Sequence, residues 1–342
     1  MSASASWWPS ENGRPMILSA PAVDALSRLI WQFTLLLVLL ALVVVLLLVL
    51  RRLVAELRGE GLARAREQAR RLILAHLRGD GPPLDRRELP ALPTDYLIEL
   101  VDELAQMVRG EGRDRLAALG ERLGLVDRLL RVLRSWRPGL RVEAARRLAI
   151  YRGERVEEAL REALSDRAPQ VRVAAATALL GRERLPAGLL GQARRDAAFA
   201  RPAAFPFWHR LAETRPDLFL ELFDEPGPPG RRVPMLRAAG VAGLARLAER
   251  MVEDTASPDP AVRRAATMAL LDLKHPLALD ALRRLLADPD PRLRADAVIA
   301  VGRRELRALL GRLRDLLEDP DPAVRFHAEE ALLRLGGTEK GR

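Results

Sequence analysis

The most apolar stretch of the chain lies near its N-terminus. Residues 29–50 read LIWQFTLLLVLLALVVVLLLVL, with no charged side chain and only Gln32 and Thr34 as polar interruptions. As a helix this stretch would be about 33 Å long, which matches the hydrocarbon core of a bilayer. A helix of a soluble core would show a polar stripe over such a length. The pattern therefore predicts a transmembrane helix over residues 29–50.

The charges that flank this stretch predict its orientation. Residues 1–28 hold two arginines, whereas Arg51 and Arg52 begin a run of seven arginines within residues 51–71. Basic flanks stay on the cytoplasmic side, and a tryptophan such as Trp31 favours the membrane interface. Residues 1–28 are therefore expected to form an extracytoplasmic tail. The rest of the chain is expected in the cytoplasm, as the main part of a single-pass protein of the cell (inner) membrane.

The chain after the apolar stretch divides by composition. Residues 51–78 combine leucines with arginines and predict a basic juxtamembrane helix. Residues 79–93, GDGPPLDRRELPALP, are rich in glycine and proline and predict a linker. Residues 94–135 predict amphipathic capping helices, residues 136–338 a repeat region and residues 339–342 a tail.

A motif of the form Pro-x-aliphatic-Arg recurs in the repeat region. Five copies begin at Pro138, Pro169, Pro260, Pro291 and Pro322, so the steps are 31, 91, 31 and 31 residues. The step of 91 residues leaves room for two divergent repeats, one of which is expected to start at PMLR, residues 234–237. An aspartate directly precedes the last three prolines, as expected for an N-cap followed by proline at the first helical position. Each unit then reads as two helices, of which the second carries a leucine stripe with helical spacing. Because neither helix can bury its stripe alone, successive pairs are expected to stack into an all-α solenoid.

The residues that carry the repeat also resemble a known family. The segments LLADPDPRLRADAVIAV and LLEDPDPAVRFHAEEAL are similar to HEAT-type repeats, specifically the short HEAT-like repeats of the phycobilisome lyases. The whole layout resembles membrane-anchored bacterial HEAT-repeat proteins that accompany membrane glycosyltransferases. This resemblance implies a fold in which a transmembrane helix precedes an α-solenoid of HEAT-like helical hairpins.

The resemblance also implies a role for the repeated arginines. In repeats of this type the arginine pairs with a carboxylate of the neighbouring unit, and suitable aspartates stand three residues before several repeat prolines. A row of arginines that binds phosphate is the alternative. The expected internal ladder comprises Arg141, Arg172, Arg263, Arg294 and Arg325 with Asp166, Asp288 and Asp319.

Aromatic side chains gather where the repeat becomes irregular, within residues 199–223. They either fill a widened core or form a docking patch for a partner. The partner-binding candidates are Phe199, Phe205, Phe207, Trp208, Phe219 and Phe223.

The composition limits the chemistry of the protein. The absence of cysteine excludes disulfides, thiolate zinc sites and cysteine nucleophiles, and the four histidines are widely spaced. No phosphate loop, dinucleotide motif or Ser-x-x-Lys nucleophile pattern occurs, so we expect no metal, no cofactor and no enzymatic activity. The net charge is +10, but half of this excess lies within residues 51–87, which argues against a nucleic-acid surface on the repeats.

These patterns together predict a membrane-tethered cytoplasmic scaffold or adaptor that binds a protein partner through its solenoid. By resemblance, the partner is a membrane protein such as a glycosyltransferase. The alternatives are a nucleic-acid-binding HEAT-like protein and a lyase-like or chaperone-like enzyme.

Overall fold

A computed structural model describes residues 20–79, 84–182 and 184–336 of the chain. Within these ranges the secondary structure consists of α-helices, short 3₁₀ segments and connecting loops. The chain forms two units: one comprises Met1–Leu72 with Leu89–Leu92, and the other Ile73–Glu88 with Pro93–Arg342.

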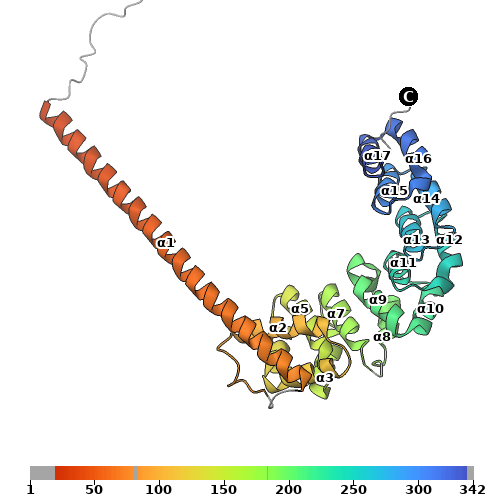
Figure 1. Cartoon of the computed structure of the whole chain (residues 1–342), viewed down its shortest axis with the longest axis horizontal. Helices are drawn as coiled ribbons and strands as arrows, with labels where there is room; N and C mark the ends of the chain where they lie inside the picture. The colour runs from red at the N-terminus through yellow and green to blue at the C-terminus, as the bar shows by residue number, and fades with distance from the viewer. Residues whose placement is uncertain (1–19, 80–83, 183, 337–342) are drawn as a thin grey trace, which may run out of the picture. The chain divides into compact units, whose positions relative to one another are not determined.

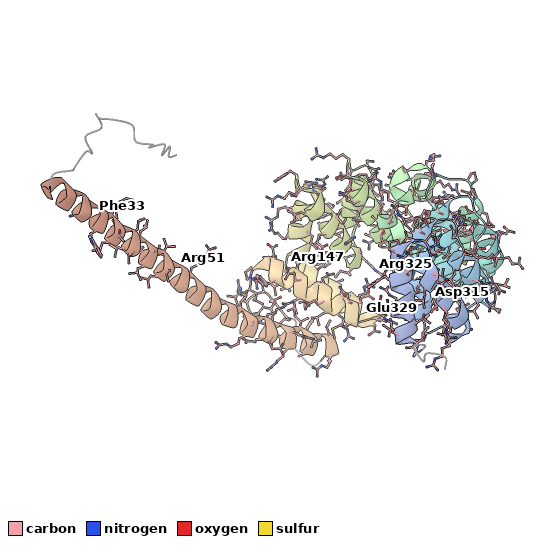
Figure 2. The ribbon with its side chains drawn as sticks, turned by 90° about the horizontal axis from the view of Figure 1, so that it is seen from above. Phe33, Arg51, Arg147, Asp315, Arg325 and Glu329 are labelled. Carbon is pink, nitrogen blue, oxygen red and sulfur yellow. The ribbon has the colours of Figure 1, made fainter. Side chains whose placement is uncertain are left out.

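The first unit contains most of helix α1, Ala20–Arg78. Apolar side chains along residues 31–47 are exposed, as Phe33 on this helix illustrates (Figure 2). Trp31 is also exposed, and Arg51 lies further along the same helix. The side chain of Arg52 lies outside the described residues.

The prediction of a transmembrane helix over residues 29–50 is wrong. Among the residues searched, which are those whose side chains the structure describes, no helix combines the length and apolarity needed to cross a membrane. The expected fold class is therefore corrected to an all-α helical repeat solenoid, and the described residues do not support the expected single-pass localisation at the cell membrane.

The second unit begins with the end of α1 and three helices. These are α2, Thr94–Met107, α3, Glu111–Arg122, and α4, Leu125–Leu133. They cover the region predicted to cap the repeats. Arg115 of α3 donates from Nη1 to the carbonyl oxygen of Leu77 at 3.2 Å, which joins α3 to the last turn of α1.

Two rows of helices form the solenoid (Figure 1). Successive helices of the inner row pack against one another within residues 138–272 and again within residues 291–334. Helices of the outer row alternate with them in sequence. The inner row is α5 (Pro138–Arg147), α7 (Pro169–Leu179), α9 (Phe205–Thr214), α11 (Arg232–Val241), α13 (Pro260–Asp272), α15 (Pro291–Arg303) and α17 (Pro322–Arg334). The outer row continues from α4 with α6 (Glu154–Ala163), α8 (Leu189–Arg195), α10 (Pro216–Asp224), α12 (Ala248–Asp254), α14 (Ala278–Leu286) and α16 (Leu310–Asp315).

The predicted start signals of the inner helices are confirmed. The carboxylates of Asp259, Asp290 and Asp321 accept hydrogen bonds from backbone N–H groups two residues later at 2.8–2.9 Å, and each is followed by proline at the first helical position. These caps satisfy amide groups that the helix itself leaves without a partner.

Small residues set the close approach of inner helices. A Cβ atom added at Gly240 of α11 would lie 2.7 Å from the Cα atom of Ala269 in α13. Gly302 of α15 faces Ala331 of α17 in the same way, with 3.0 Å between the added Cβ and the Cβ of the alanine. Gly240 and Gly302 are two repeats apart, so the same contact recurs along the row.

Candidate interaction surface

The repeated arginines and aspartates form a ladder between units. In each of three rungs the arginine donates from Nε and Nη2 to both oxygens of one carboxylate at 2.7–2.9 Å. These rungs are Arg141–Asp166, Arg263–Asp288 and Arg294–Asp319. A third nitrogen, Nη1, donates to backbone carbonyls five and six residues earlier. The guanidinium group therefore joins its own loop to the next unit.

Two further positions depart from the expected ladder. Arg172 pairs with Asp196, at 2.6 and 2.9 Å, a partner that the sequence analysis did not name. Asp196 precedes a 3₁₀ segment rather than a proline, so its sequence lacks the motif of the other rungs. Arg325 donates to the carbonyls of Asp319 and Pro320, and no carboxylate of the described residues accepts a hydrogen bond from it.

The sequence analysis also missed one rung, Arg232–Asp254. Arg232 donates from Nε to the carboxylate of Asp254 at 2.8 Å and from Nη1 to the carbonyl of Phe223. The guanidinium also covers the Phe223 ring, 3.6 Å from its centroid. The proline motif of this helix, PMLR at residues 234–237, begins two residues after Arg232, so Arg232 is not the arginine of the motif. The usable signals were this motif and the room for two divergent units in the interval of 91 residues.

The electrostatics of the ladder are those of paired internal charges. The hydrogen bonds of Arg263 and Arg294 hold the pKa values of Asp288 and Asp319 below the ordinary range, against the effect of burial. Burial raises the pKa of Asp254 instead, because it outweighs the pairing with Arg232. Since the paired arginines already hold carboxylates, they have little capacity left for external phosphate.

The aromatic cluster lies in the interior of the solenoid. Phe199, Phe207, Trp208, Phe219 and Phe223 are fully buried, whereas Phe205 is half-buried. The rings of Phe199 and Phe207 meet edge to face at 4.7 Å, and Trp208 donates from Nε1 to the carbonyl of Phe199 at 2.8 Å. Burial of this kind favours the core interpretation over the docking patch, while binding by these side chains stays a prediction.

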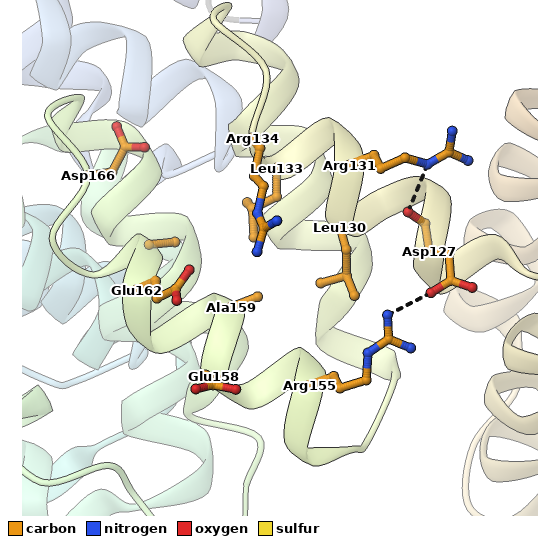
Figure 3. Close-up of a pocket in the computed structure, with 11 residues that line it drawn as sticks. Asp127, Leu130, Arg131, Leu133, Arg134, Arg155, Glu158, Ala159, Glu162 and Asp166 are labelled. Carbon is orange, nitrogen blue, oxygen red and sulfur yellow. Dashed lines mark hydrogen bonds and ion pairs between the residues drawn. The ribbon is translucent and has the colours of Figure 1, made fainter.

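An open groove separates α4 from α6 (Figure 3). Its volume is about 540 Å³, and its lining combines apolar residues of both helices with charged residues at the rim. Leu130 of α4 and Arg134, just after this helix, face Glu158 and Glu162 of α6 across this space. We call it the α4–α6 groove. The full lining is Asp127, Leu130, Arg131, Leu133, Arg134, Arg155, Glu158, Ala159, Glu162, Ala163 and Asp166.

Charged residues fix one end of the groove. Arg155 of α6 donates to the carboxylate of Asp127 in α4 at 2.9 Å, and Arg131 donates to the backbone carbonyl of the same aspartate at 3.3 Å. At the other end lies Asp166, which is held by Arg141. The rim therefore carries both signs of charge over apolar side chains.

An exposed tryptophan lies beside this second end. The guanidinium that binds Asp166 also donates to the carbonyl of Trp136 at 3.1 Å, so the backbone of Trp136 lies close to this end of the groove. The side chain of Trp136 is 74% exposed, with Arg137 over its ring at 4.8 Å. Leu140, four residues later, is 45% exposed.

Within the described part of the chain, no three histidine, cysteine, aspartate or glutamate side chains are grouped so that they could hold a metal ion. The pairs His209–Glu213 and His327–Glu330 lie one helical turn apart at 3.5 and 3.6 Å.

Residues 284–340 match the family model of HEAT repeats. This match covers the last helices of the solenoid, from the end of α14 through α17. No curated relative matches the chain.

Several solved structures resemble the chain at low identity. The complex of CpcE and CpcF of phycocyanin lyase from Nostoc sp. PCC7120 is 20% identical, with a TM-score of 0.27, over 75% of this chain and 98% of that chain. Human deoxyhypusine hydroxylase in complex with glycerol is 19% identical, with a TM-score of 0.26, over 79% and 97%. Kap121p bound to Pho4p is 17% identical, with a TM-score of 0.27, over 78% of this chain and 39% of that chain. At these identities the likeness concerns the fold alone.

Proposed function

We propose that this protein is a scaffold that binds a protein partner, and that the α4–α6 groove together with Trp136 contacts that partner. The HEAT-repeat match and the two-row solenoid support the general function, because stacked repeats present extended surfaces to other proteins. The observation that carries the proposal is the exposure of Trp136 close to the α4–α6 groove.

The exposure of Leu140 strengthens this choice of surface. Leu140 is the second residue after a repeat proline, and its equivalents in later repeats, Val171, Leu293 and Val324, are buried. The first repeat therefore leaves uncovered an apolar position that other repeats cover. Tryptophan is enriched among the residues that dominate binding energy at protein interfaces, and an adjacent leucine enlarges the apolar contact.

The chemistry of the groove indicates the kind of segment that would fit. Leu130 and Ala159 offer apolar contact, while the rim presents arginines and glutamates. A helix with an apolar stripe between charged residues of both signs would match this pattern. In this proposal the protein acts by binding rather than by catalysis. An accessory role beside a glycosyltransferase, which the resemblance implies, stays a prediction.

A comparative capture experiment tests the proposal. The wild-type protein, Trp136→Ala/Leu140→Ala and Ala159→Arg are each used to purify partners from native cells, and the captured proteins are quantified by mass spectrometry. Ala159→Arg fills the groove with a long side chain. We expect the captured amount of one partner protein to fall by about tenfold with each of the two variants. This decrease corresponds to about 1.4 kcal/mol of binding free energy.

Phe326→Ala provides the matched control. Phe326 is also an exposed aromatic residue of the inner row, but it belongs to α17. Capture should be unchanged by this substitution. Loss of the partner with Phe326→Ala alone would contradict the assignment of the groove, and equal capture by all variants would contradict binding through this surface.

A further inference from the structure

A second cavity lies against another face of α6 and is unusually rich in arginine. Its volume is about 670 Å³. It is formed by Glu157 and Arg161 of α6, by Arg152 just before this helix and by the irregular segment that follows α7. We call it the arginine cavity. The lining is Arg152, Glu157, Arg161, Gly181, Arg182, Arg184, Leu185, Pro186 and Ala187.

The charges of this lining are unbalanced. The described residues of the lining comprise four arginines and one glutamate, a net charge of +3 among them. Glu157 accepts a hydrogen bond from Arg161 at 2.7 Å through Oε2, so its charge is already shared. Glu183, between two of the arginines in sequence, lies outside the described residues. The α4–α6 groove differs, because its three arginines face four carboxylates.

Arg182 is the most constrained of the four arginines. Its residue is 7% exposed, and Nη2 donates to the carbonyl of Tyr151 at 2.7 Å. Its buried Nε has no hydrogen-bond partner among the described residues, and the nearer oxygen of Glu157 is 3.8 Å away. A buried donor without a partner is costly, so this nitrogen indicates a missing acceptor.

The pKa of Arg182 points in the same direction. Burial lowers this pKa, Glu157 opposes the effect, and the positive charge of Arg152 lowers it further. The guanidinium therefore lies in surroundings that supply too little negative charge. An anion in the cavity would relieve both the burial cost and the repulsion from Arg152.

We propose that the arginine cavity binds the phosphoryl group of a small phosphate ester. Arg152, Arg182 and Arg184 supply the donors, because the planar guanidinium matches the oxygens of a phosphoryl group. Leu185, Pro186 and Ala187 provide an apolar wall for the organic part of the ester. A cavity of this volume suits a small molecule. A phosphoryl group carries nearly two negative charges, whereas a carboxylate carries one, so it fits a net charge of +3 better.

Calorimetric titration of the purified full-length chain tests this assignment. The probes are phenyl phosphate, inorganic phosphate and benzoate at constant ionic strength. We expect saturable binding of phenyl phosphate, and binding of benzoate weaker by about tenfold or more. Inorganic phosphate shows whether the organic part of the ligand contributes to binding. If it binds more weakly than phenyl phosphate, the ligand is an ester; if it binds equally well, the ligand is the free phosphate ion.

Three variants connect the binding to the cavity. Arg152→Ala/Arg184→Ala should weaken phenyl phosphate binding by about tenfold, because both residues are exposed donors of the lining. Glu157→Gln should strengthen binding severalfold, because it removes the negative charge of the lining. Arg146→Ala removes the same charge from an exposed position of α5 outside the cavity and should change binding less than twofold.

Several results would overturn the proposal. These are the absence of saturable phenyl phosphate binding, equal binding of benzoate, and weakening by Arg146→Ala as strong as that by the double variant. A decrease of affinity with Glu157→Gln would also contradict it. Because the double variant leaves Arg182 and its bond to Tyr151 in place, circular dichroism is expected to show an unchanged fold.

Discussion

Arg294 and Asp319 form a two-bond ion pair between successive repeats, with Nη2 to Oδ1 at 2.7 Å and Nε to Oδ2 at 2.8 Å. The side chain of Asp319 is 4% exposed and that of Arg294 is 13% exposed. This pair joins the start of α15 to the loop before α17. Removal of one partner leaves a poorly solvated charge at the junction of two units.

We expect Asp319→Asn to lower the free energy of unfolding by about 2–4 kcal/mol, because Arg294 loses its counter-charge while the shape of the residue is kept. Asp315→Asn is the control, since Asp315 is exposed and pairs only with Arg312 one turn away at 3.6 Å. It should change stability by about 0.5 kcal/mol or less. Urea denaturation followed by circular dichroism measures both. Equal effects of the two substitutions would show that the ladder contributes little.

The same pair predicts an acid-sensitive contribution to stability. Arg294 lowers the pKa of Asp319 below its value of 3.8 in the unfolded chain. The Asp319 carboxylate therefore binds a proton less readily in the folded protein than in the unfolded chain. The contribution of the ion pair to stability is complete above about pH 4, and it is lost as the pH falls through the lower pKa of the folded state. The stability difference between wild type and Asp319→Asn should shrink as pH is lowered from 7 toward 3. A difference independent of pH would contradict this origin.

Asp254 should behave differently from Asp319. Burial raises its pKa, so ionisation of this carboxyl group costs free energy in the folded state despite the bond from Arg232. We expect Asp254→Asn to cost less stability at pH 7 than Asp319→Asn does, measured by the same urea denaturation. A larger cost at Asp254 would indicate that the two rungs do not differ in this way.

Close packing of the inner row makes a prediction for three glycines. Gly240→Ala should lower stability by about 1–3 kcal/mol, because the new methyl group would meet backbone of α13. Gly302→Ala should cost less, since its nearest neighbour is a side-chain methyl group at 3.0 Å. Gly311→Ala, in α16 with no atom within 4 Å, should raise stability by up to about 1 kcal/mol. Thermal denaturation should give this order, and a reversed order would contradict the described helix spacing.

The aromatic cluster distinguishes core from surface. Phe207→Ala should destabilise the protein by about 3–5 kcal/mol, because the ring is fully buried. Phe205→Ala should cost about 1 kcal/mol, because this half-buried ring contacts Arg237 and His209 near the surface. The comparison uses chemical denaturation of both variants. A small cost at Phe207 would return it to the candidates for partner contact.

Much of the fold follows from local sequence. The Asp-Pro pairs at Asp259, Asp290 and Asp321 mark helix starts because a capping acceptor and a proline act within two residues of each other. The spacing of 31 residues also placed the arginines and carboxylates of successive rungs in register. Asp196 and Asp254 escaped this reasoning because neither stands three residues before a repeat proline.

The N-terminal stretch shows where pattern alone was misleading. An uninterrupted apolar run with basic flanks predicted a membrane helix, but the part of it whose side chains the structure describes does not meet the length and apolarity of a span. Similarly, the concentration of phenylalanines suggested either a core or a patch. Whether these rings are buried or exposed depends on the side chains that other helices pack against them, and composition alone does not show those contacts.

The sequence by itself determined the helices, their two-helix units and the repeat period, because caps, prolines and apolar spacing act over a few residues. Tertiary structure decided which apolar side chains are covered: Leu140 is exposed although its equivalent Val171 is buried. It also brought Arg152 and Arg182, 30 residues apart in sequence, to one cavity. The burial of a side chain and the balance of charge around it depend on residues from adjacent repeats. They are therefore determined only when the repeats stack.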